Sequence, residues 1–132
     1  MPNNALDELC ARRREQVAKL IEIQEITQRI AEAVSRKDEL SLQLMLGERE
    51  QPILRLRELE EGIGSYLLTR PEAEAARLHE LLRGAEAASG EERPLAELTD
   101  KYRRMLEAVV ALDRRVSEQL GGKLSFYKKF NR

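Results

Sequence analysis

The sequence predicts an all-α protein, an elongated antiparallel helical bundle with coiled-coil-like packing of three to four helices. Leu, Glu, Arg, Ala and Lys supply 78 of the 132 residues, and such an excess is typical of long helices. Apolar residues recur every three or four positions along four stretches of the chain, which is the period of an amphipathic helix. Glycine or proline stands near most ends of these stretches. We therefore expect one helical domain over residues 1–132.

The first helix is expected over about residues 4–36, with Asn4 as its N-cap. Its apolar positions run from Leu6 to Val34 and are spaced mostly by three and four, while most charged residues fall between them. At 1.5 Å per residue such a helix is about 50 Å long. A helix of this length needs partner helices beside it, because isolated helices are only marginally stable in water.

The second helix is expected over about residues 38–61, with Asp38 as its N-cap. Pro52 lies inside it and lacks a backbone donor, so a kink or a restart is expected just before this residue. Gly62 and Gly64 are expected to stop the helix. The candidate core residues are Leu42, Met45, Leu46, Ile53, Leu56 and Leu59.

The third helix is expected over about residues 70–88, capped near Thr69 or Arg70, with Pro71 in its first turn. Residues 89–94 then read as a loop because they contain Ser, Gly and Pro. The expected apolar stripe of this helix is Leu78, Leu81, Leu82 and Ala85.

The fourth helix is expected over about residues 94–120 and ends at Gly121 and Gly122. Its apolar residues alternate in spacings of three and four, as in the seam of a coiled coil. The expected seam is Leu95, Leu98, Tyr102, Met105, Val109, Leu112 and Val116.

The C-terminal tail, residues 121–132, differs in composition from the rest of the chain. It holds three of the five aromatic residues and four positive charges, whereas residues 1–120 carry a formal net charge of −5. Exposed aromatic side chains are costly, so a contact is expected for Phe126, Tyr127 and Phe130. The tail could be disordered, could fill an apolar groove of its own chain, or could dock on another protein.

Composition excludes several kinds of chemistry. With one cysteine, Cys10, and one histidine, His79, the chain can form neither an internal disulfide nor a Cys/His zinc site. We expect Cys10 to be a small buried residue and His79 to lie at the surface. Phosphate-binding and nucleophile motifs are absent. We therefore expect no catalytic, metal-binding or cofactor-binding residue, and no cofactor.

Partners are limited by charge and hydropathy. The run of residues 12–14, all arginine, precedes several glutamates on an acidic body, which favours a solvated helix face over nucleic-acid binding. The longest apolar run, residues 108–112, is far shorter than the roughly 20 residues of a membrane span. The start of the chain lacks the apolar region of a signal peptide. A cytoplasmic protein without membrane insertion is expected.

One enzyme remains as a weak alternative. Residues 49–54, which begin Arg-Glu and end Ile-Leu, are similar to the Arg-Glu-x-x-Val-Leu stretch of helical chorismate mutases. Those enzymes also have Ile-Asp pairs on the first helix, which are missing from this chain, and Pro52 interrupts the motif. We therefore expect no enzymatic activity.

The layout of the chain resembles the FlgN-type flagellar export chaperones and the related FliT-type family. The resemblance consists of a first helix of about 30 residues, a charged break that ends in Asp38, and the Leu- and Glu-rich residues 40–60. It implies a cytoplasmic, non-enzymatic chaperone that binds terminal segments of flagellar axial proteins, mainly the hook-filament junction proteins. Such a chaperone keeps these segments unassembled and delivers them to the flagellar export apparatus.

In these families the C-terminal helical region usually binds the client, and residues 95–132 match it. Helix-in-groove binding would bury the apolar face of an amphipathic client segment. The main alternative is a homodimeric coiled-coil adaptor or structural protein that uses the same seams and has no client. The candidate protein-binding residues are Met105, Val109, Leu112, Val116, Leu120, Leu124, Phe126 and Tyr127.

Overall fold

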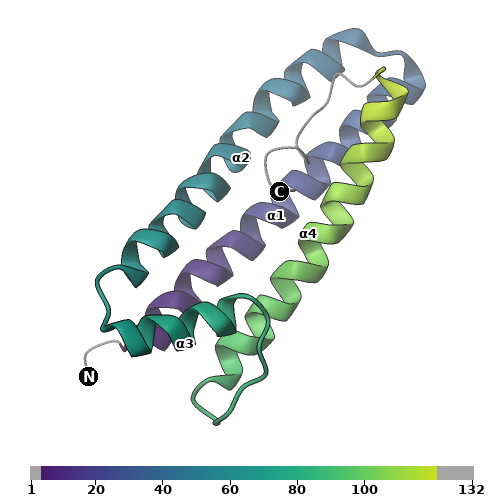
Figure 1. Cartoon of the computed structure of the whole chain (residues 1–132). Coiled ribbons are helices and arrows are strands. Elements are labelled where there is room, and N and C mark those ends of the chain that lie inside the picture. The colour runs from purple at the N-terminus through teal and green to yellow at the C-terminus, as the bar shows by residue number, and fades with distance from the viewer. Residues whose placement is uncertain (1–3, 122–132) are drawn as a thin grey trace. The chain divides into compact units, whose positions relative to one another are not determined.

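The fold was taken from a computed structural model, which describes residues 4–121 and contains four helices and no strand in that range (Figure 1). Helix α1 spans Ala5–Arg36, α2 spans Glu39–Leu67, α3 spans Glu72–Leu82 and α4 spans Arg93–Gln119. Helices pack against one another through apolar side chains, so the predicted all-α bundle is confirmed.

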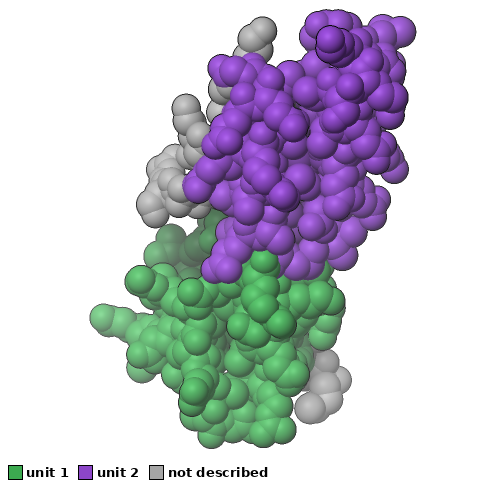
Figure 2. All heavy atoms as spheres, turned by 90° about the vertical axis from the view of Figure 1, so that its right-hand side faces the viewer, with its two compact units in different colours: residues 1–18, 56–104 green, residues 19–55, 105–132 purple. Residues whose placement is uncertain are grey.

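Two compact units make up the chain (Figure 2). Unit 1 comprises residues 1–18 and 56–104, and unit 2 comprises residues 19–55 and 105–132. Unit 1 therefore contains parts of all four helices, whereas unit 2 contains parts of α1, α2 and α4. The prediction of one domain over the whole chain stays a prediction.

The core of unit 1 is apolar and receives side chains from four helices. Cys10 is buried in it, as expected, and burial raises the pKa of its thiol. The short helix α3 contributes three leucines, which explains why this helix forms although it has only 11 residues. The buried members are Ala5, Leu9, Cys10, Ile63, Leu78, Leu81, Leu82 and Leu95.

Arg13 lies inside unit 1, contrary to the solvated face predicted for the three consecutive arginines. Its guanidinium donates hydrogen bonds to Gln16 Oε1 at 2.7 Å, to the Leu82 carbonyl at 2.9 Å and to Thr99 Oγ1 at 3.4 Å. It also stacks 4.5 Å from the centre of the Tyr102 ring. An arginine can be buried when its donors find acceptors, and three of the five donors of Arg13 do so here. Burial nevertheless lowers the pKa of Arg13.

Helix α2 continues past the two glycines that were predicted to stop it. Gly62 instead makes room for Arg12, because a Cβ at this position would lie 2.6 Å from Arg12 Nη1. The Arg12 guanidinium then lies 5.6 Å from the centre of the Tyr66 ring. The packing of Ile63 and its neighbours in unit 1 offsets the helix-breaking tendency of glycine.

The core of unit 2 is formed by α1, α2 and α4. Its buried apolar residues include Leu20, Ile23, Ala33, Ile53 and Val109. In one cluster of this unit, Ile30 and Val116 are buried and the apolar residues packed against them are only partly buried. Pro52 is buried within α2, which runs through it without interruption, so the expected restart does not occur. The partly buried members are Ile26, Ala31, Val34, Leu42, Met45, Leu46, Leu112 and Leu120.

Arg49 and Asp113 form a buried ion pair in unit 2. Arg49 Nη2 donates a hydrogen bond to Asp113 Oδ1, and both side chains are almost completely enclosed. A charge is costly to bury without a partner of opposite sign. The pairing therefore favours the alignment of α2 and α4 that brings Arg49 and Asp113 together. The arginine of the chorismate mutase-like stretch is thus engaged by a carboxylate of its own chain.

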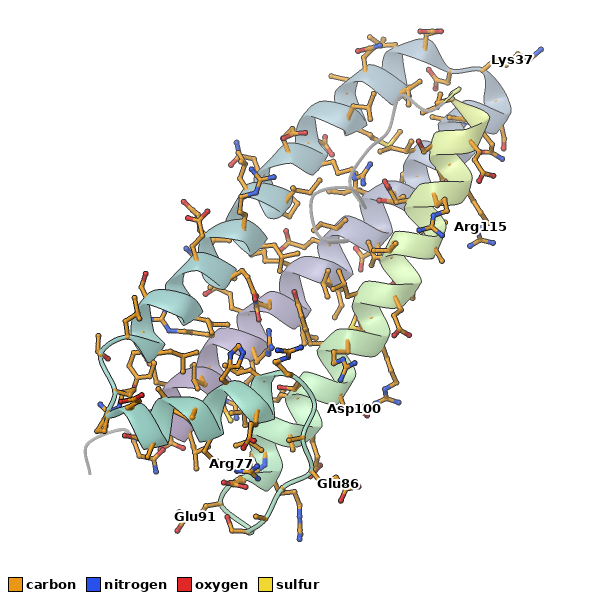
Figure 3. All side chains as sticks on the ribbon, viewed as in Figure 1. Lys37, Arg77, Glu86, Glu91, Asp100 and Arg115 are labelled. Atoms are coloured by element: carbon orange, nitrogen blue, oxygen red, sulfur yellow. The ribbon has the colours of Figure 1, made fainter. Side chains whose placement is uncertain are left out.

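A two-residue turn joins α1 to α2. The Lys37 N–H donates to the Val34 carbonyl at 3.1 Å, and the Asp38 N–H donates to the Ala33 carbonyl at 2.9 Å. This Schellman arrangement places Lys37 at φ 58°, and its side chain points into solvent (Figure 3). Asp38 also caps α2, because its carboxylate accepts the Ser41 N–H at 3.1 Å. Hydrogen bonds from Ser41 lower the pKa of Asp38.

The other caps agree only partly with the prediction. Asn4 Oδ1 accepts the Asp7 N–H at 2.9 Å, which confirms the cap of α1. Pro71 is the N-cap of α3 rather than a residue of its first turn. Gly121 has φ 68° and follows α4, which confirms that the helix ends there.

Helix α3 ends at Leu82, six residues before the predicted end. Gly84 stops it in a Schellman motif with φ 107°, in which the Gly84 N–H bonds the Leu81 carbonyl and the Ala85 N–H bonds the Glu80 carbonyl. Arg103 Nη1 donates to the Arg83 carbonyl at 2.9 Å, so a Cβ on residue 84 would collide with Arg103.

In the part of the chain that the structure describes, no helix combines the length and the apolar character needed to span a lipid bilayer.

Candidate protein-binding site

The predicted binding residues on α4 divide into buried and partly exposed ones. Val109 and Val116 are buried in unit 2, whereas Met105, Leu112 and Leu120 are partly exposed. The first two therefore serve the core of the protein itself in this structure. The remaining predicted residues, Leu124, Phe126 and Tyr127, lie outside the described residues.

The buried seam of α4 follows a different path from the predicted one. Thr99 and Asp113 are fully buried, while Leu98 and Leu112 lie beside them and are partly exposed. In unit 1 Thr99 accepts a hydrogen bond from Arg13. In unit 2 Asp113 accepts one from Arg49. Apolar spacing could not reveal this seam, because three of its members, Thr99, Asp113 and Ser117, are polar.

A cavity of about 280 Å³ opens in unit 2 beside the turn between α1 and α2. Its apolar lining comes from three helices and includes Leu120 from the predicted site. Its charged lining comes from the turn and the start of α2. The lining residues are Ala33, Val34, Lys37, Asp38, Glu39, Leu42 and Leu120.

A second apolar feature of unit 2 lies on the outer side of α2 and was not predicted. Leu40, Leu44 and Leu54 are 73%, 61% and 46% exposed. Residues 40, 44, 47, 51 and 54 are spaced by four and three and therefore share one helix face. We call these five positions, Leu40, Leu44, Gly47, Gln51 and Leu54, the leucine stripe.

The core of unit 2 lies on the other side of α2, toward which Met45, Arg49 and Ile53 point. The sequence did contain a signal for the stripe. Leucine occupies every second position from residue 40 to residue 46, and positions two apart in a helix point to different faces. One helix cannot bury all four of these leucines against a single core.

Gly47 stands in the middle of the leucine stripe. A Cβ added there would meet no other atom within 4 Å, and the residue does not have a positive φ. Glycine in a helix interior costs about 0.5–1 kcal/mol relative to alanine. Nothing within the described part of the chain requires glycine at this position.

The charges beside the stripe have both signs, because exposed Arg55 and Arg57 lie beside its C-terminal end and exposed Glu48 and Glu50 lie beside its middle. Between Glu39 and Leu54 the charged residues are Glu39, Glu48, Arg49 and Glu50. Arg49 is buried against Asp113, so all exposed charges of this segment are negative. Glu39 and Glu48 make no ion pair with another described residue.

A polar cavity of about 270 Å³ lies in unit 1, between the start of α1, α3 and the loop after α3. Arg77 reaches from α3 to this loop (Figure 3), where it binds both carboxylate oxygens of Glu92 at 2.6 and 3.1 Å and the Glu86 carbonyl at 3.0 Å. These bonds, with one from the Ala88 N–H, lower the pKa of Glu92 to about 2. Arg77 therefore orders the loop.

Metal-ligating side chains do not gather anywhere between residues 4 and 121: no group of three or more His, Cys, Asp or Glu residues could hold an ion there. His79 is exposed on α3, as predicted.

The fold and these surfaces define an all-α helical bundle with exposed leucines, three of which lie on α2 in unit 2. No family model, no curated protein and no solved structure matches the chain.

Proposed function

We propose that this protein is a chaperone that binds an amphipathic helical segment of another protein and has no enzymatic activity. One observation carries the proposal: the core of unit 2 is bordered by partly exposed apolar residues, and α2 exposes three further leucines. Exposed apolar surface of this kind is characteristic of helix-in-groove recognition.

The proposed clients are terminal segments of flagellar axial proteins, mainly the hook-filament junction proteins. This part of the proposal comes from the sequence resemblance to FlgN-type and FliT-type chaperones. The protein would act in the cytoplasm, hold these segments unassembled and deliver them to the flagellar export apparatus. Met105 and Leu112 on α4 and Leu120 directly after it remain partly exposed, so these predicted binding residues are available for such contact.

The test is titration of the full-length protein into fluorescently labelled terminal peptides of hook-filament junction proteins, measured by anisotropy. We expect saturable binding with one peptide per chain. The control is a peptide of the same composition in which the apolar residues no longer follow the helical period. Equal binding of the native and the rearranged peptide would contradict the proposal.

Light scattering under the same conditions tests the homodimeric alternative. A chaperone is expected to form a complex whose mass increases by one peptide. A stable dimer that is indifferent to every terminal peptide would instead support an adaptor without a client.

A further inference from the structure

The cavity of unit 2 lies directly beside the place where the C-terminal tail begins. Leu120, one of its lining residues, stands immediately before Gly121, the last residue that the structure describes. Gly121 has φ 68° and ends the helical path of α4. The tail therefore starts at the edge of this cavity.

The cavity has the size and the lining of a site for an aromatic ring. Its volume is about 280 Å³, whereas an engineered apolar cavity of about 150 Å³ in another protein binds benzene. Four of its seven lining residues are apolar, and three of these, Val34, Leu42 and Leu120, are only partly buried. A ring in the cavity would shield them from water and gain hydrophobic free energy.

The charged lining residues do not select an occupant, because they have both signs. Lys37 is positive, whereas Asp38 and Glu39 are negative. Asp38 is also balanced by Arg36, whose guanidinium lies 3.9 Å from its carboxylate. Apolar contact is therefore the basis on which this cavity would recognise an occupant.

The tail contains the aromatic side chains that such a cavity fits. Phe126 is the aromatic residue nearest to Gly121 in the sequence, and residues 122–126 can span up to about 17 Å when extended. Unlike Tyr127, it has no hydroxyl group that needs a partner when buried. Phe126 can therefore reach the cavity and fill it without leaving a polar group unpaired.

The covalent connection favours this occupant over one from another molecule. A segment joined by a short linker acts at an effective concentration of about a millimolar. An aromatic residue of another protein, or the tail of a second copy, would need a comparable concentration in solution to compete by apolar contact alone.

We infer that the C-terminal tail turns back on unit 2 and places the Phe126 ring in this cavity. The inference goes beyond the proposed function and does not depend on it, because the contact lies within one chain. The docked tail would cover Leu120, so a client that uses this residue would have to displace Phe126.

A tryptophan in place of Phe126 reports whether the ring is enclosed, because the chain itself contains no tryptophan. Pockets bury about 70–90% of the surface of the ligand that they hold. Acrylamide should therefore quench the fluorescence of full-length Phe126→Trp about three- to tenfold less than that of Leu68→Trp, whose position is 88% exposed. The emission maximum of Phe126→Trp should also lie at a shorter wavelength.

A substitution in the cavity shows where the ring is held. Val34→Phe adds an aromatic ring to the lining and should displace the indole of Phe126→Trp, so that quenching rises to the level of Leu68→Trp. The matched control is Ile21→Phe, at an exposed position of the same helix outside the cavity. It should leave the quenching unchanged.

Thermal unfolding provides a second readout that needs no tryptophan. Phe126→Ala should lower the midpoint of unfolding, because the cavity loses its occupant. The same substitution should have no effect in the Val34→Phe variant, whose cavity is already filled, and should keep its effect in the Ile21→Phe variant. Far-UV circular dichroism verifies that both variants retain their helices.

Three results would overturn the inference. These are equal quenching of Phe126→Trp and Leu68→Trp, protection of Phe126→Trp that Val34→Phe does not change, and an equal effect of Phe126→Ala with and without Val34→Phe. Protection that increases with protein concentration would also overturn it and would identify the cavity of a second copy as the site, since a contact within one chain does not depend on concentration.

Discussion

Unit 1 and unit 2 each bury one arginine near a polar residue of α4, but they satisfy it differently. In unit 1 Arg13 donates hydrogen bonds to three neutral acceptors, stacks on Tyr102, and has its nearest carboxylate, the exposed one of Glu60, 3.7 Å away. In unit 2 Arg49 is bound to the buried carboxylate of Asp113. In unit 1 the charge is thus shared among several contacts, whereas in unit 2 the arginine is paired directly with an enclosed carboxylate.

The two units also differ in how well their apolar residues are covered. Unit 1 includes α3, whose leucines Leu78, Leu81 and Leu82 belong to a core of eight buried residues. Unit 2 has no counterpart of α3 among its described residues, and most of the apolar residues around Ile30 and Val116 are only partly buried. The leucines of α3 thus enlarge the buried core of unit 1, whereas the cluster around Ile30 and Val116 in unit 2 keeps a partly exposed border.

The largest effect is expected at the ion pair of unit 2. Asp113→Ala should lower the free energy of unfolding by about 3–5 kcal/mol, because it leaves Arg49 buried without its carboxylate. Thr99→Ala, the corresponding change on α4 in unit 1, should cost only about 1 kcal/mol. Urea unfolding followed by circular dichroism measures both.

A double variant tests the reason for that effect. Replacing both partners, as Arg49→Met with Asp113→Leu, should recover most of the stability lost in Asp113→Ala. An equal cost for Thr99→Ala and Asp113→Ala would show that the two units do not differ in the way described.

The next largest effect is expected at the arginine of unit 1. Arg13→Met keeps much of the apolar stem but removes three hydrogen bonds and the contact with Tyr102. We expect a loss of about 2–4 kcal/mol in chemical unfolding. The control is Arg14→Met, because Arg14 is exposed and should change stability by less than about 0.5 kcal/mol. Similar losses of stability in the two variants would mean that the buried contacts of Arg13 do not stabilise unit 1.

Tyr102 gives unit 1 a pH dependence in the alkaline range. Burial raises the pKa of its phenol from 10.0 to about 12. Because the neutral form is favoured in the folded state, this contribution is fully present below about pH 10 and is lost as the pH rises to about 12. A rise of this size in the pKa of Tyr102 corresponds to about 2–3 kcal/mol. Denaturant unfolding across this range should show the loss.

Tyr102→Phe isolates this contribution from those of other titrating groups. The unfolding free energy of the wild-type protein, minus that of the variant, should fall as the pH rises from about 10 to about 12. A constant difference would show that Tyr102 does not have the raised pKa.

The smallest effects are expected at two turns with the same motif. Gly84 in unit 1 and Lys37 in unit 2 both have positive φ in Schellman motifs. Gly84→Ala should destabilise the protein by about 1–2 kcal/mol. Lys37→Gly should stabilise it by about 0.5–1 kcal/mol, because it relieves the strained conformation. Thermal unfolding measures both changes, and a loss of stability in Lys37→Gly would contradict this account.

Local features of the fold could be predicted from the sequence, and features that depend on distant partners could not. The caps at Asn4 and Asp38 were predicted correctly because the side chain and the amide it binds are three residues apart. The burial of Arg13 was missed because its acceptor Thr99 lies 86 residues away. The end of α3 was misplaced because the alanines after Gly84 favour helix, although that glycine already had the chemistry of a helix stop.

The candidate site shows the same division. Apolar spacing found the α4 residues of unit 2 but could not say that Val109 and Val116 would be used in the core. The leucine stripe is also a matter of spacing, yet recognising it required knowing which side of α2 faces the other helices. A helix with leucine on several faces has more than one candidate core face until its neighbours are known.

The double use of Asp38 has a consequence for the order of folding. Its N–H closes the last turn of α1 and its carboxylate opens α2, so only two residues separate these helices. Closing so short a loop costs little chain entropy, whereas Arg49 and Asp113 meet across 64 residues. Contacts that are near in sequence form fastest. We therefore expect the hairpin of α1 and α2 to form first and to serve as the template on which α4 then docks.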